Sequence, residues 1–279
     1  MKKTSAEQYI LTADELRRLQ LVLLEMLLEI DKICRKNNIR YIIDGGTLLG
    51  AVRHGGFIPW DDDLDVVMTR GEYERFRAVC ETDLDCEKYF FQDNTTDAEY
   101  RWGYGKLRRK NSEFLRHNQE HLKMKTGIFL DIFPRDNVPD SKVSYFFHNI
   151  YCYTLRKLLY ARVGMVVENS PAFRLWYRLL NLIPHSFAFK KIAKLSRKSN
   201  KKEARRMRTL TFPMLRKGQF GYERRWFEQI GEIEFEGHTF PCPQDYDGYL
   251  KELYGDYMTP PPEDKRGLHP VSKFKLPED

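Results

Sequence analysis

The sequence predicts an α+β protein in which helices pack on a mixed β-sheet. Apolar residues first recur at the spacing of an amphipathic helix, and short apolar runs rich in isoleucine and valine follow at 39–43 and 63–68. More strand-like runs come later, so the order is α, β, α, β, α and then several strands. With 279 residues, 42% of them apolar, the chain can bury one large domain or a domain with a sizeable insertion.

The first helix begins after Thr12, because Thr12 and Glu15 form the pattern of a capping box. Asn37-Asn38 ends it. Its buried face is expected to consist of Leu16, Leu19, Leu23, Met26, Ile30 and Ile33.

The other elements follow from apolar periodicity and from glycine breaks. Strands are expected at 39–43, 63–68, 89–91, 104–107 and 127–133. Helices are expected at 47–53, after Thr69, over most of 141–210 and at 246–254. A hairpin turning at Glu236-Gly237 is expected over 233–240, and the tail from residue 260 reads as irregular.

Charge divides the chain into three parts. Residues 141–217 hold 18 basic and 2 acidic residues, a net charge of +16, so the rest of the chain carries −9 of the overall +7. We therefore predict a core domain at 1–140, a basic helical insertion at 141–217, and a segment at 218–279 that completes the core.

The chain has features expected of a cytoplasmic protein. Its five cysteines are odd in number and form no C-x-x-C pair, which favours reduced thiols. Met1-Lys2-Lys3 begins like a signal peptide, but no apolar stretch follows it. No run of about 18 apolar residues occurs, so we expect no membrane-spanning helix.

Four acidic residues, Asp61, Asp62, Asp63 and Asp65, crowd the start of the strand at 63–68. In a regular strand, Asp61, Asp63 and Asp65 share one face, and Asp62 points to the other. Crowded carboxylates repel, and a hard divalent cation such as Mg²⁺ or Mn²⁺ removes that cost.

This acidic cluster has two other interpretations. One is a solvated acidic turn. The other is an EF-hand, because Asp61, Asp63, Asp65 and Glu72 fall at positions 1, 3, 5 and 12 of such a loop. Position 6 should be glycine but is Val66, inside a strand-like run, so the EF-hand is rejected.

A phosphate-binding turn is predicted at Gly45-Gly46-Thr47. Glycines let backbone N–H groups approach a phosphate, and Thr47 adds a hydroxyl at the start of a helix. A Gly-Gly pair alone is weak evidence. A strand, Gly-Gly-Thr, a short helix and then Asp63-Leu64-Asp65 at the next strand is a much more specific pattern.

These residues resemble a known family. The Gly-Gly and Asp-x-Asp arrangement looks like the nucleotidyltransferase fold, and "DGGTLLGAVRHGGFIPWDDDLDV" resembles the LicD family of phosphocholine transferases, to which the fukutin-related proteins are also similar. Thr47 departs mildly from the fold pattern, where serine is commoner. Further matches lie at 105–114, 127–136 and 240–258, and the resemblance is least specific at 141–218.

The resemblance implies transfer of a phospho-alcohol group, phosphocholine foremost, from a CDP-activated donor to a sugar hydroxyl, with release of CMP. The acceptor would be a precursor of a cell-surface glycan such as teichoic acid or lipopolysaccharide. Asp131 falls on the family's third acid and would complete a metal site with Asp63 and Asp65, while Asp61 would be an auxiliary ligand. Asp131 would also accept or orient the proton of the acceptor hydroxyl.

Several other residues are candidates for donor binding. Arg53 and His54 follow the glycine turn, and Lys106 and Arg108 lie two apart on an expected strand. Trp60, Trp102 and Tyr104 could form an aromatic box for a quaternary ammonium, or could be ordinary core residues. His269 matches a family pattern near the C-terminus without an assigned role.

The basic segment suggests a membrane surface as a partner. An apolar stripe accompanies its basic residues and consists of Phe173, Trp176, Leu180 and Ile183. Basic residues beside such a stripe are typical of peripheral binding to anionic membranes, here the inner face of the cytoplasmic membrane, where family acceptors are often lipid-linked.

Two other functions remain open from the residues alone. One is a glycosyltransferase that holds a nucleotide sugar through Asp63-Leu64-Asp65, although the preceding Gly-Gly-Thr turn argues against it. The other is nucleic-acid binding by the basic segment. No zinc-finger or RNA-binding signature accompanies that segment, so we expect no nucleic acid partner.

Overall fold

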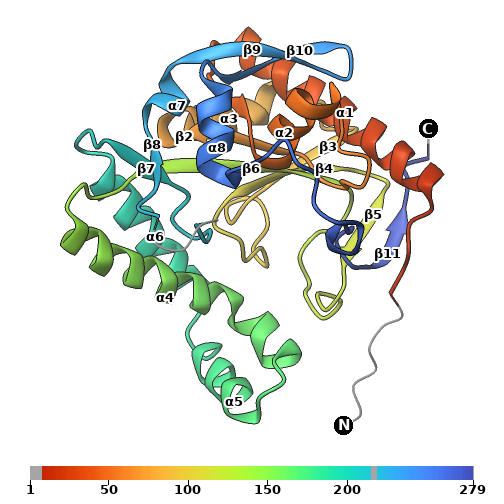
Figure 1. The fold of residues 1–279 in the computed structure, drawn as a ribbon. Coiled ribbons are helices and arrows are strands. Elements are labelled where there is room, and N and C mark those ends of the chain that lie inside the picture. Colours follow the sequence, from red (N-terminus) through yellow and green to blue (C-terminus); the bar gives the residue numbers. More distant parts are fainter. Residues whose placement is uncertain (1–7, 215–218, 279) are drawn as a thin grey trace.

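The computed structural model describes residues 8–214 and 219–278. The first residues, considered above for a signal peptide, and the predicted end of the basic insertion at 215–217 lie outside the described residues. The predicted α+β class is confirmed by a mixed sheet with helices on it (Figure 1). Its strand order is β1 (Ile42–Ile43), β2 (Asp65–Thr69), β6 (Phe129–Asn137), β4 (Gly105–Arg109) and β3 (Tyr89–Gln92).

Register in the centre of the sheet places three candidate site residues in one row. Strands β2 and β6 are parallel, and Asp65 pairs with Asp131. Strand β4 runs antiparallel to β6 on its other side, and Lys106 pairs with Asp131. Because paired residues of adjacent strands project to the same face, the three side chains are neighbours on one side of the sheet.

Helices α1 (Ala13–Lys36) and α3 (Arg70–Asp83) pack on one another and against β6, above it in Figure 1. The predicted capping box is confirmed: the Glu15 N–H donates to the Thr12 hydroxyl at 3.2 Å, and the Thr12 N–H donates to the Glu15 carboxylate at 2.9 Å. The expected apolar face of α1 is buried, apart from Leu16, which is partly exposed.

Three helices follow β6: α4 (Lys142–Val167), α5 (Pro171–Leu180) and α6 (His185–Ser199). They lie on the other side of β6 from α1 in Figure 1. The expected helical stretch to residue 210 is wrong at its end, because β7 (Arg206–Arg208) pairs with the end of β6 and with β8 (Tyr222–Glu223). A local basic pattern could not reveal this pairing, which joins residues far apart in the chain.

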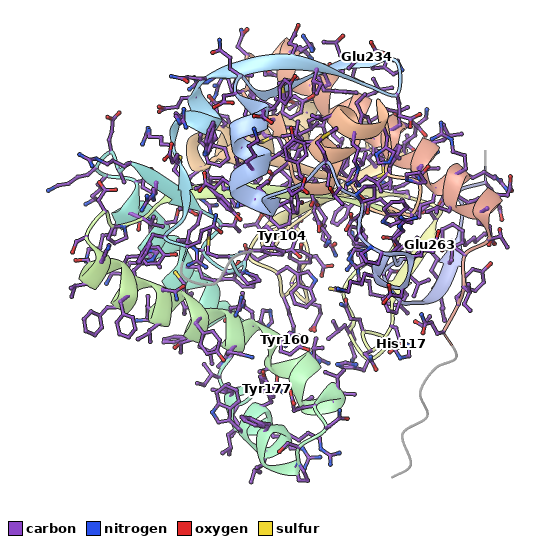
Figure 2. The ribbon with its side chains drawn as sticks, in the orientation of Figure 1. Tyr104, His117, Tyr160, Tyr177, Glu234 and Glu263 are labelled. Atoms are coloured by element: carbon purple, nitrogen blue, oxygen red, sulfur yellow. The ribbon has the colours of Figure 1, made fainter. Side chains whose placement is uncertain are left out.

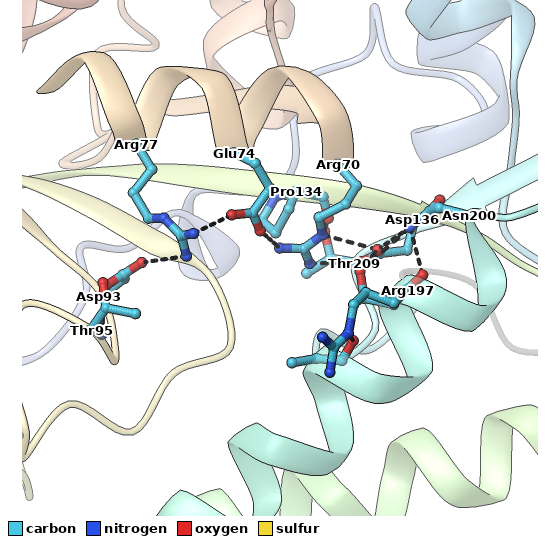
Figure 3. A network of polar contacts seen from close by, with 12 residues as sticks. Arg70, Glu74, Arg77, Asp93, Thr95, Pro134, Asp136, Arg197, Asn200 and Thr209 are labelled. Carbon is cyan, nitrogen blue, oxygen red and sulfur yellow. Dashed lines mark hydrogen bonds and ion pairs between the residues drawn. The ribbon is translucent and has the colours of Figure 1, made fainter.

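Hydrogen bonds to Asp136 connect α6 to the sheet. This fully buried carboxylate at the end of β6 accepts hydrogen bonds from Arg70 of α3, with N–O distances of 2.9 and 2.7 Å, and from Asn200 beyond α6 at 2.7 Å. Figure 3 shows Asp136 between these residues, with Glu74 and Arg77 continuing the polar network along α3. The basic helical segment is therefore tied directly to the strand that carries Asp131.

The C-terminal segment returns to the core. The predicted hairpin is confirmed as β9 (Ile230–Phe235) and β10 (His238–Pro243), preceded by α7 (Arg225–Glu228) and followed by the expected helix α8 (Tyr246–Tyr254). The expectation of an irregular tail is wrong at β11 (Val271–Lys275), which pairs with β5 (Glu113–Arg116). A short 3-10 helix (Glu263–Lys265) and His269 lie between α8 and β11.

Glycine permits a tight connection between the first two strands. Helix α2 (Gly45–His54) joins β1 to β2, and Gly45 has φ of +56° where the helix begins. Side chains are strained in that left-handed region, which glycine occupies freely. No helix in the described part of the chain is both long and apolar enough to cross a membrane.

Candidate active site

Asp63, Asp65 and Asp131 line one cavity of about 210 Å³. Asp65 opens β2, and the Asp131 N–H donates to the Leu64 carbonyl at 3.0 Å, which holds the two strands in register at the cavity. Asp63 lies just before β2. The structure therefore brings together the three carboxylates that the sequence analysis selected.

Asp61 approaches the start of α2. A Cβ atom built on Gly46 would lie 2.7 Å from the Asp61 carboxylate, and one built on Gly45 would lie 3.3 Å from that of Asp65. The strand expected from residue 63 begins at Asp65, so the alternation of a regular strand does not explain the positions of Asp61 and Asp63. Both glycines are needed because carboxylates occupy the space where side chains would be.

The carboxylates are costly to ionise without a cation. Burial, reinforced by the charges of Asp63 and Asp62, raises the pKa of Asp61 to about 8. Burial also raises the pKa of Asp63, and raises that of Asp65 well above its usual range. A hard divalent cation such as Mg²⁺ or Mn²⁺ near these carboxylates could offset this cost.

Asp62 has a partner that the sequence analysis missed. Its buried carboxylate accepts hydrogen bonds from the Nδ1 atom of His269 at 2.7 Å and from the backbone N–H of His269 at 3.0 Å. The Nδ1 atom also lies 3.5 Å from Asp63, and the hydrogen bond with Asp62 raises the pKa of His269. These three residues offer ligand atoms within 4.8 Å of one another, a grouping that could hold a cation.

Basic side chains lie beside the carboxylates. The Lys106 ammonium contacts Asp131, and Arg116 lies 3.5 Å from Asp63. Burial nevertheless lowers the pKa of Lys106 to about 7, because it outweighs the attraction of Asp131. Arg108 lines the same cavity and donates to the Gln92 side chain at 2.6 Å and to the Gly127 carbonyl at 2.7 Å. Arg116 was not predicted, because it lies on β5, far from Asp63 in the sequence, and the two residues meet only in the folded chain.

Thr47 connects the glycine turn to strand β2. The Asp65 N–H donates to the Thr47 hydroxyl at 2.9 Å, and Thr47 is buried. The hydroxyl of Tyr254, on α8, lies 3.6 Å from a Cβ built on Gly45. The start of α2, the start of β2 and the C-terminal helix thus converge at one point beside the cavity.

The remaining predicted donor contacts fall in two places. Trp102 and Tyr104 line the cavity with Lys106 and Arg108. Arg53 and His54 lie at the other end of α2, about 12–14 Å along the helix axis from Gly45.

At that end of α2 the predicted residues contact one another and the tail. Arg53 donates to the Tyr257 carbonyl at 3.0 Å. The ring centroids of His54 and Trp60 lie 6.3 Å apart, and Arg266 lies 4.4 Å from the centroid of Trp60. The predicted aromatic box is therefore divided between two places, because Trp60 does not line the cavity.

The cavity and its surroundings have the composition of an enzyme that handles phosphate groups. Residues 38–158 match the domain described as LicD/FKTN/FKRP, nucleotidyltransferase domain. The chain is also 30% identical over 274 residues to the lipopolysaccharide cholinephosphotransferase LicD of Haemophilus influenzae, an alignment that covers 92% of this chain and 97% of that protein.

The protein belongs to the LicD family and is a transferase of that family. It is also similar to the ribitol 5-phosphate transferase FKRP of human and mouse, 61% identical over 65 residues, which are 22% of this chain and 13% of FKRP. The resemblance drawn from the glycine turn and the aspartates is confirmed.

Proposed function

We propose that the protein transfers a phospho-alcohol group, phosphocholine foremost, from a CDP-activated donor to a sugar hydroxyl of a cell-surface glycan precursor and releases CMP. The observation that carries this proposal is the pairing of Asp65 with Asp131 in one cavity beside the glycine turn. The relatives support it, since one is named a cholinephosphotransferase and another a ribitol 5-phosphate transferase.

Asp63, Asp65 and Asp131 would hold one or two Mg²⁺ or Mn²⁺ ions, with Asp61 as an auxiliary ligand. A bound cation of this kind neutralises the charge that develops on the donor phosphates. Asp131 would orient the acceptor hydroxyl and accept its proton. The new P–O bond forms to that oxygen as the bond to the CMP oxygen breaks. Lys106, in contact with Asp131, would hold this carboxylate in place.

The donor phosphates would bind between the start of α2 and the cations of β4. Gly45, Gly46 and Thr47 supply close backbone approach, and Lys106 and Arg108 supply charge. Trp102 and Tyr104 line the cavity where a choline headgroup could meet aromatic faces. Arg53, His54 and Trp60 remain predicted donor contacts. If they bind the donor, its nucleotide must extend along α2, because these residues lie at the far end of that helix.

We further propose that the protein binds peripherally to the anionic inner face of the cytoplasmic membrane, where its acceptor would be lipid-linked. Support comes from exposed apolar side chains on α4 and α5, among them Val143, Phe146, Phe147, Ile150, Phe173, Leu175, Trp176 and Leu179. Of the predicted stripe, Phe173, Trp176 and Ile183 are exposed, whereas Leu180 packs partly buried against the helices. Basic side chains of α6 would supply the attraction to lipid headgroups.

The test is incubation of the purified protein with Mg²⁺, a panel of CDP-activated donors and a saccharide acceptor, with products detected by mass spectrometry. CDP-choline, CDP-ethanolamine and CDP-ribitol give CMP and a phospho-alcohol product if the proposal is right, and their rates rank the alcohols. Chelation of the metal should stop the reaction. Release of UDP or GDP from nucleotide sugars, without CMP from any CDP donor, would replace it with the glycosyltransferase alternative.

A further inference from the structure

A second cavity, of about 480 Å³, lies between the loop at 101–104 and helices α4 and α5. It shares Trp102, Tyr104 and Phe212 with the carboxylate cavity. Figure 2 shows Tyr104 beneath the sheet, with Tyr160 and Tyr177 farther toward α5, and all three line the second cavity. The two cavities are therefore adjacent, and a ligand bound in the second cavity would lie next to the carboxylate cavity.

The lining of the second cavity is basic. Arg101, Arg156 and Lys157 face it, against one acidic residue, Glu168. Lys157 donates to the Tyr177 hydroxyl at 2.8 Å, which is a neutral partner. The cavity thus has an excess of positive charge that an anionic ligand would balance.

Two buried polar groups in this lining lack partners. Arg101 is only 6% exposed, and the Nε atom of its guanidinium is buried without a hydrogen-bond partner in the described part of the chain. The nearby carboxylate of Glu99 binds Arg162 instead, at 2.9 Å. The buried hydroxyl of Thr211 is also unpartnered. Burying such groups without partners is costly, so both indicate a polar ligand at this place.

The remaining walls are aromatic. Tyr160 and Tyr177 meet with ring centroids 5.8 Å apart, and Trp102 lies on the side of the carboxylates. Aromatic rings offer flat apolar faces with polar edges at the tyrosine hydroxyls. A saccharide has matching apolar C–H faces and hydroxyl edges, so the lining suits a sugar with an anionic group.

We propose that this second cavity binds the glycan acceptor, and that Arg101 and Arg156 bind a phosphate or carboxylate group carried by that glycan. The inference rests on the proposed function, because it assigns the acceptor of the same reaction. The acceptor hydroxyl then enters the carboxylate cavity past Trp102 and Tyr104.

Binding to the full-length protein, without any CDP donor, tests this directly. Glucose 6-phosphate, glucose and inorganic phosphate serve as probes in calorimetric titrations of the wild type, Arg101→Gln, Arg156→Gln and Arg178→Gln. Arg178 is an exposed residue of α5 outside the cavity lining and is the matched control. The wild type and Arg178→Gln should bind glucose 6-phosphate more tightly than either simpler probe, and the two cavity variants should bind it about tenfold or more weakly.

Two outcomes would overturn the inference. One is equal affinity for glucose 6-phosphate and inorganic phosphate, which would indicate only an anion site. The other is unchanged glucose 6-phosphate binding in a correctly folded Arg101→Gln or Arg156→Gln, with folding checked by circular dichroism. Two variants are used so that misfolding of one leaves the other informative.

Slow hydrolysis of the CDP donor in the absence of acceptor separates this inference from the proposed function. Both cavity variants should release CMP to water as the wild type does, while KM for a phosphorylated acceptor rises about tenfold. If the wild type releases no CMP from any donor but still binds glucose 6-phosphate through Arg101, the proposed function fails and the sugar site remains. If transfer occurs with unaltered acceptor KM in the variants, the sugar site fails and the function remains.

Discussion

Asp131 lies directly opposite Asp65 on the parallel strand β6, and both carboxylates line the same cavity. Neither residue is near the other in sequence, and the pairing of β2 with β6 alone sets their relation. Lys106 pairs with Asp131 from the other side. Two acids and one cation are therefore fixed by three adjacent strands, and the glycine turn at the start of α2 completes the arrangement.

Asp65→Asn should abolish transfer while stabilising the metal-free fold. The substitution removes a metal ligand, which costs several kcal/mol of transition-state stabilisation, or about a thousandfold in rate. It also removes a carboxyl group whose ionisation is disfavoured by burial and by the charges of Asp63 and Asp131, so the melting temperature without metal should rise. Mg²⁺ should raise the wild-type melting temperature more than that of the variant.

Asp264→Asn is the control for this variant, because Asp264 is exposed and outside the cavity lining. If Asp65→Asn released CMP at the wild-type rate, the assignment of Asp65 as a metal ligand would be wrong.

Gly46→Val should abolish donor binding with near-normal expression. A Cβ at this position would lie 2.7 Å from the Asp61 carboxylate, and the larger side chain would occupy the approach to the N–H groups of α2. The measurement is a titration with CDP-choline. Gly71→Ala is the matched control, because a Cβ there would meet nothing within 4 Å. Full donor affinity in Gly46→Val would contradict a phosphate site at this turn.

Asp136→Asn should lower the free energy of unfolding by about 2–3 kcal/mol, because it leaves Arg70 without its buried counter-charge. Urea denaturation measures the change. Glu74→Gln removes the other carboxylate near Arg70, which lies 3.3 Å away in a partly exposed ion pair. This variant should lower the free energy of unfolding by less than about 1 kcal/mol. Equal effects of the two variants would show that Asp136 is not the main attachment of α6.

The free energy of unfolding should fall in mild acid because of His148. Burial, with the charge of Arg208 adding to it, lowers the pKa of this α4 residue to about 4 from an unfolded value near 6.5. The folded protein therefore keeps His148 neutral where the unfolded chain binds a proton. Its contribution is complete above about pH 6.5 and is lost as the pH falls toward 4, by at most about 1.4 kcal/mol per unit.

Denaturation at pH 7 and pH 5 should thus differ less in His148→Gln than in the wild type. His238→Gln, at an exposed position of β10, should keep the wild-type difference. The same pH dependence in wild type and His148→Gln would assign the acid sensitivity to other groups.

The wild type should sediment with anionic but not with neutral vesicles, and salt should weaken the binding because it screens exposed charges. Each basic residue near such a surface contributes about 1 kcal/mol. Charge reversal to Glu at Lys190, Lys191, Lys194, Arg197 and Lys198 should release the protein and spare transfer to a soluble acceptor. A wild type that ignores anionic vesicles at low salt would end the membrane proposal.

Local patterns predicted much of the fold. Three features that depend on residues close in sequence were predicted. They are the apolar period of α1, its capping box and the hairpin at Glu236-Gly237. Strands β7 and β11 were not predicted. Each is short and rich in basic residues, and each forms because a distant strand offers unpaired backbone groups to it. No local periodicity reports such a partner.

The candidate site likewise contains residues that local sequence patterns predicted and contacts that only the folded chain creates. Asp63, Asp65 and the glycine turn were found from the sequence, because crowded acids beside glycines are chemically conspicuous. Arg116, the contact of Asp62 with His269 and the second cavity were not, since each depends on segments that meet only in the folded chain. Asp62 also departed from strand alternation, because β2 begins three residues after it.

The sequence by itself determined the family, the α+β class and the acidic residues that mark the cavity, because these follow from residue types at short spacings. The tertiary structure alone decided which basic side chains lie beside those acids, that Trp60 lies apart from Trp102 and Tyr104, and that Arg101 faces a second cavity next to the carboxylate cavity. The physical reason is that burial and strand pairing act between residues distant in the chain. They set which polar groups lose water and which of them find partners.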